Sequence, residues 1–159
     1  MASVASGATN QPLGTGNTLN LGVAGTSSGR LVYTGGSGTL SKNVFALGNG
    51  TDTIQNSGTG LLTLSGAVTK NGTVLRLWGG AQGITVTGLI TGTLANSDLA
   101  VQNGLTTLST TGSYTGPTFI NSSGTLALGI SNAIPSNSLV TIGGAFAGGD
   151  GGPGVLSMG

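Results

Sequence analysis

The chain has 159 residues, with 33 glycines, a net charge of +1 and neither cysteine nor histidine. This composition excludes a disulfide within the chain, a zinc site of the usual kind and an imidazole base. Only four cations are spread along the chain. They are too few to neutralise a phosphate backbone, so we expect no nucleic-acid partner.

The chain divides into three segments. Residues 1–17 have neither the basic start nor the apolar core of a signal peptide, and we expect an N-terminal extension there. Residues 18–145 carry a repeated strand pattern. Residues 146–159 look like a Gly-rich linker followed by one terminal strand. An apolar content of 36% with only four prolines argues against disorder, and no run of about 20 apolar residues predicts a membrane helix.

Short alternating apolar pairs, bounded by Gly, Asn or Ser, recur through the middle segment and predict strands. Each interior glycine would cost about 1 kcal/mol in a helix, so we expect almost no helix. In chain order the pairs are Leu19 and Leu21, Leu31 and Tyr33, Leu62 and Leu64, Leu75 and Leu77, Ile84 and Val86, Leu99 and Val101, Leu126 and Leu128, Val140 and Ile142, and Leu156 and Met158.

The apolar residues fall into three series whose steps are all 20 to 24 residues. The first is Leu19, Leu40, Leu62, Ile84, Leu105 and Leu126; the second is Leu31, Ile54, Leu75, Leu99, Ile120 and Val140; the third is Val23, Phe45, Val68, Ile90, Tyr114 and Ile134. Three short strands per repeat of about 22 residues predict an all-β parallel β-helix (β-solenoid) of six to seven coils.

Two further features refine this prediction. The inward side chains are expected to include Leu62, Leu64, Leu75, Leu77, Leu126 and Leu128. The Asn-Gly pairs that begin at Asn49, Asn71 and Asn103 are predicted to form corners, where a residue with positive φ lets the chain turn.

Residues 112–129 read G-S-Y-T-G-P-T-F-I-N-S-S-G-T-L-A-L-G. This run resembles the passenger-associated transport repeat, also called the autotransporter-associated β-strand repeat, of bacterial surface proteins. The matching positions are Tyr114, Thr115, Gly116, Thr118, Ile120, Asn121, Gly124, Leu126, Leu128 and Gly129. The resemblance implies a secreted β-helix that serves as a surface stalk, adhesin or passenger. Members of that family are usually longer and end in a membrane barrel, and this chain has no barrel pattern.

The few candidate chemical groups do not predict an enzyme. Asp52 lies in a partial calcium β-roll pattern without ligands from a following repeat, so we expect a solvated turn aspartate. We predict no catalytic residue, no metal site, no cofactor and no small-molecule substrate. Thr-x-Thr pairs begin at Thr51, Thr85 and Thr91, and their steps of 34 and 6 residues break the coil period. These pairs therefore do not predict the threonine ladder of an ice-binding solenoid.

Trp78 is the only tryptophan. It alternates with the inward Leu75 and Leu77, so we expect it to face outward as a surface contact residue. Two interpretations remain open for it: a residue that contacts a partner, and a partly covered surface ring.

The ends of the predicted solenoid suggest a function. Natural solenoids cover their terminal strand edges with polar or charged caps, and the sequence shows no such cap at either end. We therefore expect an extracellular structural subunit that joins copies of itself head to tail, with Val155, Leu156 and Met158 as a strand donated to the next subunit. The alternative is a fragment of an adhesin or autotransporter passenger stalk that contacts a cell surface or matrix.

Overall fold

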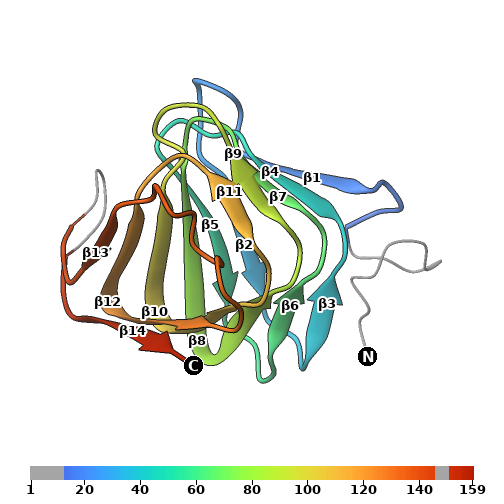
Figure 1. The fold of residues 1–159 in the computed structure, drawn as a ribbon. Coiled ribbons are helices and arrows are strands. Elements are labelled where there is room, and N and C mark those ends of the chain that lie inside the picture. The colour runs from blue at the N-terminus through green and yellow to red at the C-terminus, as the bar shows by residue number, and fades with distance from the viewer. Residues whose placement is uncertain (1–12, 146–150) are drawn as a thin grey trace.

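The computed structural model describes residues 13–145 and 151–159 of the chain, and it is an all-β parallel solenoid (Figure 1). It makes about five turns with about 23 residues per turn. The predicted fold class is therefore confirmed, while the predicted count of six to seven coils was too high. The shortfall arises at the C-terminal end, where residues 143–153 form one long connection between two strands instead of adding a coil.

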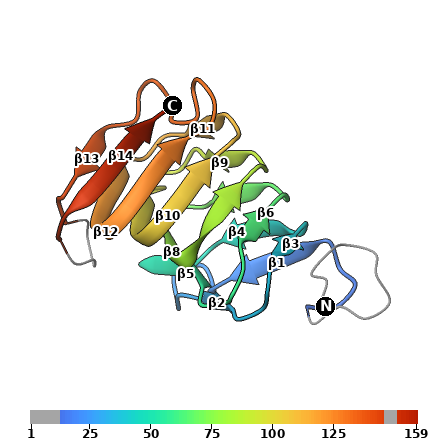
Figure 2. The same ribbon diagram turned by 90° about the horizontal axis from the view of Figure 1, so that it is seen from below.

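Each complete turn contributes to three faces, and all strand pairs are parallel, as Figure 2 shows along the stack. The first face is a five-stranded sheet. Its strands are β1 (Thr18–Leu21), β4 (Asn43–Ala46), β7 (Val68–Lys70), β9 (Ile90–Gly92) and β11 (Gly112–Tyr114).

A nine-stranded sheet bends to form the second and third faces, because its long strands pass around the corner between them. The second face contains β2 (Arg30–Tyr33), β5 (Thr51–Asn56), the first parts of β8 (Val74–Val86), β10 (Leu99–Leu108) and β12 (Thr118–Leu128), and β13 (Val140–Ile142). The third face contains β3 (Gly38–Leu40), β6 (Leu62–Leu64), the second parts of the same long strands, and β14 (Gly154–Met158).

Glycine makes the corner inside the long strands. Gly80, Gly104, Gly124 and Gly154 lie next to one another in successive turns. A Cβ atom on Gly104 would lie 2.0 Å from the carbonyl oxygen of Gly80, so no larger residue fits without moving the backbone. The predicted Asn-Gly corners are confirmed as well, since Gly50, Gly72 and Gly104 all have positive φ.

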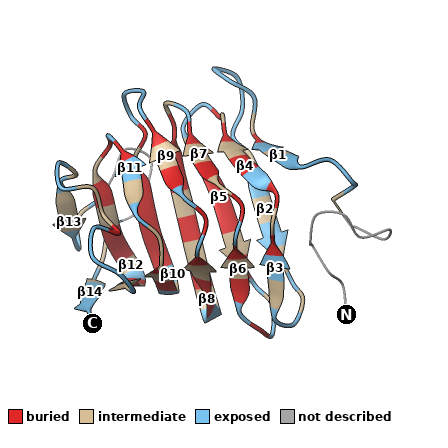
Figure 3. Ribbon diagram, turned by 45° about the vertical axis from the view of Figure 1, so that its right-hand side comes forward, coloured by how far each residue is buried: buried red, intermediate tan, exposed pale blue. Residues whose placement is uncertain are grey.

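The interior is filled by files, a file being the residues that occupy the same register position in successive turns. Figure 3 shows the buried residues concentrated in the central strands and the exposed ones toward both ends. Five of the six leucines predicted to face inward are fully buried, and the sixth, Leu128, is partly buried near the C-terminal end. The predicted strands and their inward faces are therefore confirmed.

The detailed register differs from the constant-step prediction at several positions. In the first series Leu105 is 45% exposed, and Thr106 takes the inward place between Ile84 and Leu126. The cause is a register shift between Gly104 and Thr106, where β8 carries extra residues at the corner. A uniform step therefore falls one residue short.

The other two series also need correction. In the second, the true file runs Leu31, Ile54, Leu77, Val101, Ile120 and Ile142. The predicted Leu75, Leu99 and Val140 lie two residues away on the same inward side of the same strands. In the third, Phe45 faces outward between the buried Val44 and Ala46. Val23 lies in an exposed turn rather than in a strand.

Candidate functional site

The C-terminal end of the solenoid is formed by β13 and β14. Strand β14 lies parallel to β12 of its own chain, with Leu156 beside Leu126 and Met158 beside Leu128. We expected this segment to be a strand on a linker, whereas the structure places it as the last strand of the third face. Leu156 packs against the core, while Val155 is 54% and Met158 77% exposed. Residues 146–150 of the expected linker lie outside the described residues.

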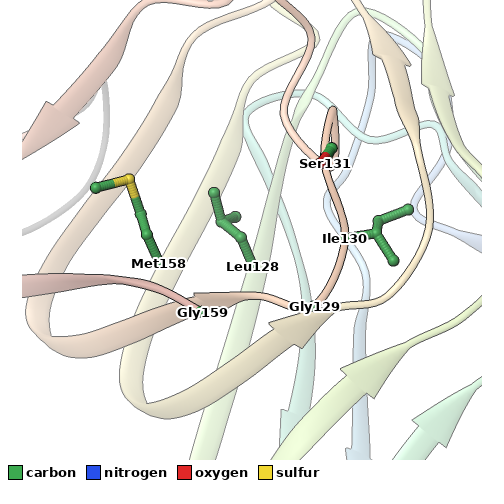
Figure 4. Close-up of a pocket in the computed structure, with 6 residues that line it drawn as sticks. All are labelled: Leu128, Gly129, Ile130, Ser131, Met158 and Gly159. Atoms are coloured by element: carbon green, nitrogen blue, oxygen red, sulfur yellow. The ribbon is translucent and has the colours of Figure 1, made fainter.

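A hollow of about 450 Å³ opens at this end, and Figure 4 shows the residues around it. Met158 and Leu128 point in the same direction from neighbouring strands, and the turn that carries Ile130 and Ser131 closes the other side. The C-terminal end therefore presents both an open strand edge and an uncovered apolar surface.

The N-terminal end is built differently. Its edge strands are β1, β2 and β3, and Leu13 packs against the core beside them. The buried Lys42 donates hydrogen bonds from Nζ to the carbonyl oxygens of Gly14 and Gly16. Because an ammonium group needs such acceptors when it leaves water, Lys42 fixes the entry of the chain into the first coil. The first twelve residues of the predicted extension lie outside the described residues.

The outer side of the second face carries Trp78. Leu75 and Leu77 are fully buried, and Trp78 is half-buried on the opposite side of the strand, so its predicted outward orientation is confirmed. The guanidinium of Arg30 lies 5.8 Å from the centre of the indole ring and donates a hydrogen bond to Oε1 of Gln55. The role of Trp78 as a contact residue stays a prediction.

A second hollow, of about 280 Å³, lies at the corner between the first and second faces. It is lined by Asn49, Gly50, Gly72, Thr73, Val74, Asn96 and Asp98. Burial raises the pKa of the Asp98 carboxyl above its usual value, and the ammonium of Lys70 acts in the opposite direction. Val74 also begins the outward row of β8 that continues through Arg76 to Trp78.

A buried lysine and tyrosine in the core escaped the sequence analysis. Nζ of Lys70 donates a hydrogen bond to the carbonyl oxygen of Ser97 and lies 3.6 Å from the centre of the Tyr114 ring. Burial lowers the pKa of Lys70 to about 7, and Asp98 partly opposes this. The signal was the 22-residue step from Lys70 to Gly92 and from Gly92 to Tyr114, which leaves a small residue between the two large side chains.

Asp52 is not the solvated turn residue that the sequence suggested. It occupies an inward position in register with Leu75 and is fully buried. Its carboxylate accepts hydrogen bonds from the backbone N–H groups of Gly29 and Gly48, at 2.6 and 2.7 Å. It therefore ties together two successive corners. Asp98 lines the outer hollow instead, and Asp150 lies outside the described residues.

The outer side of the third face carries threonines that do follow the coil period. Thr39, Thr63, Thr85 and Thr107 are direct neighbours in four successive turns. Two residues further along each strand come Ser41, Ser65, Thr87 and Ser109. The expectation of no threonine ladder was therefore wrong. The Thr-x-Thr pattern was too narrow, and a search for Thr-x-Ser as well as Thr-x-Thr would have found both rows.

Comparison with known protein families, curated proteins and solved structures finds no match to this chain. Within residues 13–145 and 151–159, no group of three or more acidic side chains could hold a metal ion. In the same part of the chain there is no helix long and apolar enough to cross a membrane.

Proposed function

We propose that the protein is a structural subunit of an extracellular bacterial fibre that joins copies of itself head to tail through the ends of the solenoid. The observation that supports this most is the open C-terminal end. There β13 and β14 offer unpaired strand edges, and Ile142, Val155 and Met158 remain more than half exposed. Such edges and apolar surfaces are normally covered.

The geometry of the two ends is suited to continuation. Strands β1, β2 and β3 form the N-terminal edge of the three faces, and β13 and β14 form the C-terminal edge of the second and third. Because all strands run in parallel, a second copy placed end-on would extend the same sheets with the same spacing of about 4.8 Å. This contact joins two different surfaces, so it does not close on itself and generates a filament.

The extracellular setting of this proposal rests on the resemblance of residues 112–129 to the autotransporter-associated repeat. In the solenoid this run includes β12, the strand that supports both β13 and β14. The repeat therefore lies beside the proposed contact surface. The outer hydroxyl rows and the scarcity of charge also suit a polymer of stacked coils, because like charges repeated in successive coils would repel one another.

The test is to image the purified full-length chain by negative-stain electron microscopy and to measure its mass by sedimentation. We expect filaments whose length increases with protein concentration. The double variant Val155→Asp/Met158→Asp places two charges on the contact surface, and we expect folded monomers. Leu89→Asp is the matched control, because Leu89 is similarly exposed on the side of the solenoid.

Two results would argue against the fibre. Filaments that persist unchanged in the double variant would show that the C-terminal edge does not make the contact. A wild-type chain that stays monomeric at all concentrations would favour the second candidate, a binding module from an adhesin or passenger stalk. The observation that favours this second candidate is the outward Trp78 with Arg30 beside it.

A further inference from the structure

Three features with different chemistry lie along one outward row of β8. The row starts at Val74, which lines the corner hollow, passes Arg76, and ends at Trp78 beside Arg30. The four residues from Val74 to Trp78 span about 13 Å of extended strand. A polar hollow, a cationic centre and an aromatic ring therefore follow one another in a line on the surface.

We propose that the outer side of β8 is a binding site for an anionic glycan chain of two to three sugar units. The indole of Trp78 offers a flat apolar surface for the C–H face of one sugar ring. Arg30 and Arg76 offer guanidinium groups for the carboxylate or sulfate groups of the glycan. The hollow offers side-chain amide and carboxyl groups for sugar hydroxyls.

The charge distribution favours an anionic ligand. Of the four cations, Lys42 and Lys70 are buried, and the remaining Arg30 and Arg76 both lie on the second face. They occupy the same outward file, one turn apart on either side of Thr53. Among the described carboxylates Asp52 points inward, so only Asp98 lies near this row, and it is at the opposite end from Trp78. Guanidinium groups recognise carboxylates and sulfates through paired N–H donors.

The floor of the row is apolar and firmly packed. Val74 and Ala100 are buried together on the outer side, with Phe119 packed against them. This small cluster holds the backbone beneath Arg76 in place, since Ala100 is its direct neighbour in the next turn. A ligand would therefore meet a preformed surface, which reduces the ordering needed on binding.

The hollow adds groups suited to hydroxyls rather than to another anion. Asn49 and Asn96 are exposed at its rim, and Asn96 is held in the left-handed region with φ of 61°. Asp98 accepts hydrogen bonds and would repel an acidic group placed there. A glycan with its neutral ring in the hollow and its acidic groups over the arginines satisfies both ends of the site.

The test uses the full-length chain and the fluorescence of its single tryptophan. The probes are oligogalacturonate, its methyl-esterified neutral form and a heparin oligosaccharide of similar length. We expect the acidic probes to quench or shift the emission, with an affinity that falls as salt is added. Esterification should weaken binding by about tenfold or more, since it removes the charged partner of the arginines. Comparison of oligogalacturonate with heparin distinguishes carboxylate from sulfate as the preferred group.

Variants measured by isothermal titration locate the site. Trp78→Ala and Arg76→Gln should each weaken binding about tenfold or more, as expected when one principal contact is lost. Phe45→Ala is the matched control, because Phe45 is a half-buried outward aromatic on the first face. Trp78→Phe keeps a ring and guards against a simple loss of folding, and it should retain part of the affinity.

The proposal is overturned if the esterified probe binds as tightly as the acidic one, or if Phe45→Ala weakens binding as much as Trp78→Ala. It is also overturned if none of the glycans binds at millimolar concentration. A single-stranded oligonucleotide that binds more tightly than both acidic glycans would overturn it as well, in favour of a nucleic-acid surface. Because the site lies on the side of the solenoid, none of these outcomes depends on whether the chain forms fibres.

Discussion

The central coils and the C-terminal end are built from the same kinds of residue in the same register, yet their burial differs sharply. Ile54, Leu77, Val101 and Ile120 form one file and are fully buried, whereas Ile142, the next member, is 51% exposed. Nothing in the identity of Ile142 sets it apart. Each coil is covered by the next one, so the last coil carries an unfinished core.

The largest test of this comparison uses one file of the third face. Leu64 is buried in a central coil, and Met158 occupies the corresponding place in the last strand, where it is 77% exposed. Leu64→Ala should lower the free energy of unfolding by about 2–5 kcal/mol, because it removes buried methyl groups and leaves a cavity. Met158→Ala should lower it by less than about 1 kcal/mol. Urea denaturation measures both, and equal effects would contradict the unfinished core.

A second test concerns a charge that only the interior can perturb. Burial lowers the pKa of Lys70 from 10.5 to about 7, so between these pH values the unfolded chain binds more protons than the folded one. The free energy of unfolding should therefore rise with pH across this window, by an amount on the order of a few kcal/mol. Burial also raises the pKa of Tyr114 from 10.0 to about 12. Stability should accordingly fall again above about pH 10, where only the unfolded tyrosine loses its proton.

Lys70→Met serves as the control for this pH dependence. The variant keeps a long side chain against Tyr114 without a titratable amine, so the rise between pH 7 and pH 10 should disappear. Chemical denaturation at a series of pH values gives the profile. A wild-type profile that is flat across this range would mean that the Lys70 amine keeps its proton in the core.

The sequence predicted the repeating parts of the molecule better than its exceptions. Alternation and glycine spacing were enough for the parallel solenoid, for three strands per turn and for the outward position of Trp78. These features are set by local geometry, which is the same in each turn. The register failed at Leu105, where a corner in one turn is longer than the same corner in the next.

The polar interior could not be predicted from hydrophobic patterns. Lys70 and Asp52 look like surface residues in sequence, because charged side chains are rarely buried without partners. Their partners are backbone groups: the Ser97 carbonyl oxygen for Lys70, and the Gly29 and Gly48 amides for Asp52. Backbone groups carry no residue-specific signal, so only the three-dimensional stack of corners identifies them. The same reason hid the C-terminal hollow, which requires the placement of β14 on β12.

The smallest expected effect separates two neighbours within β14. Leu156 faces inward and packs against the core, while Val155 faces outward and is 54% exposed. Leu156→Ala should lower the free energy of unfolding by about 1 kcal/mol, less than a central leucine, because the site is covered on one side only. Val155→Ser should change it by less than about 0.5 kcal/mol. The measurement is urea denaturation of dilute monomer, so that contacts between subunits do not contribute. If both substitutions leave stability unchanged, β14 does not rest on β12 of its own chain in solution, and the strand is then available for donation to another subunit. If Leu156→Ala alone destabilises the monomer, β14 belongs to its own solenoid and can take part in assembly only through its free edge.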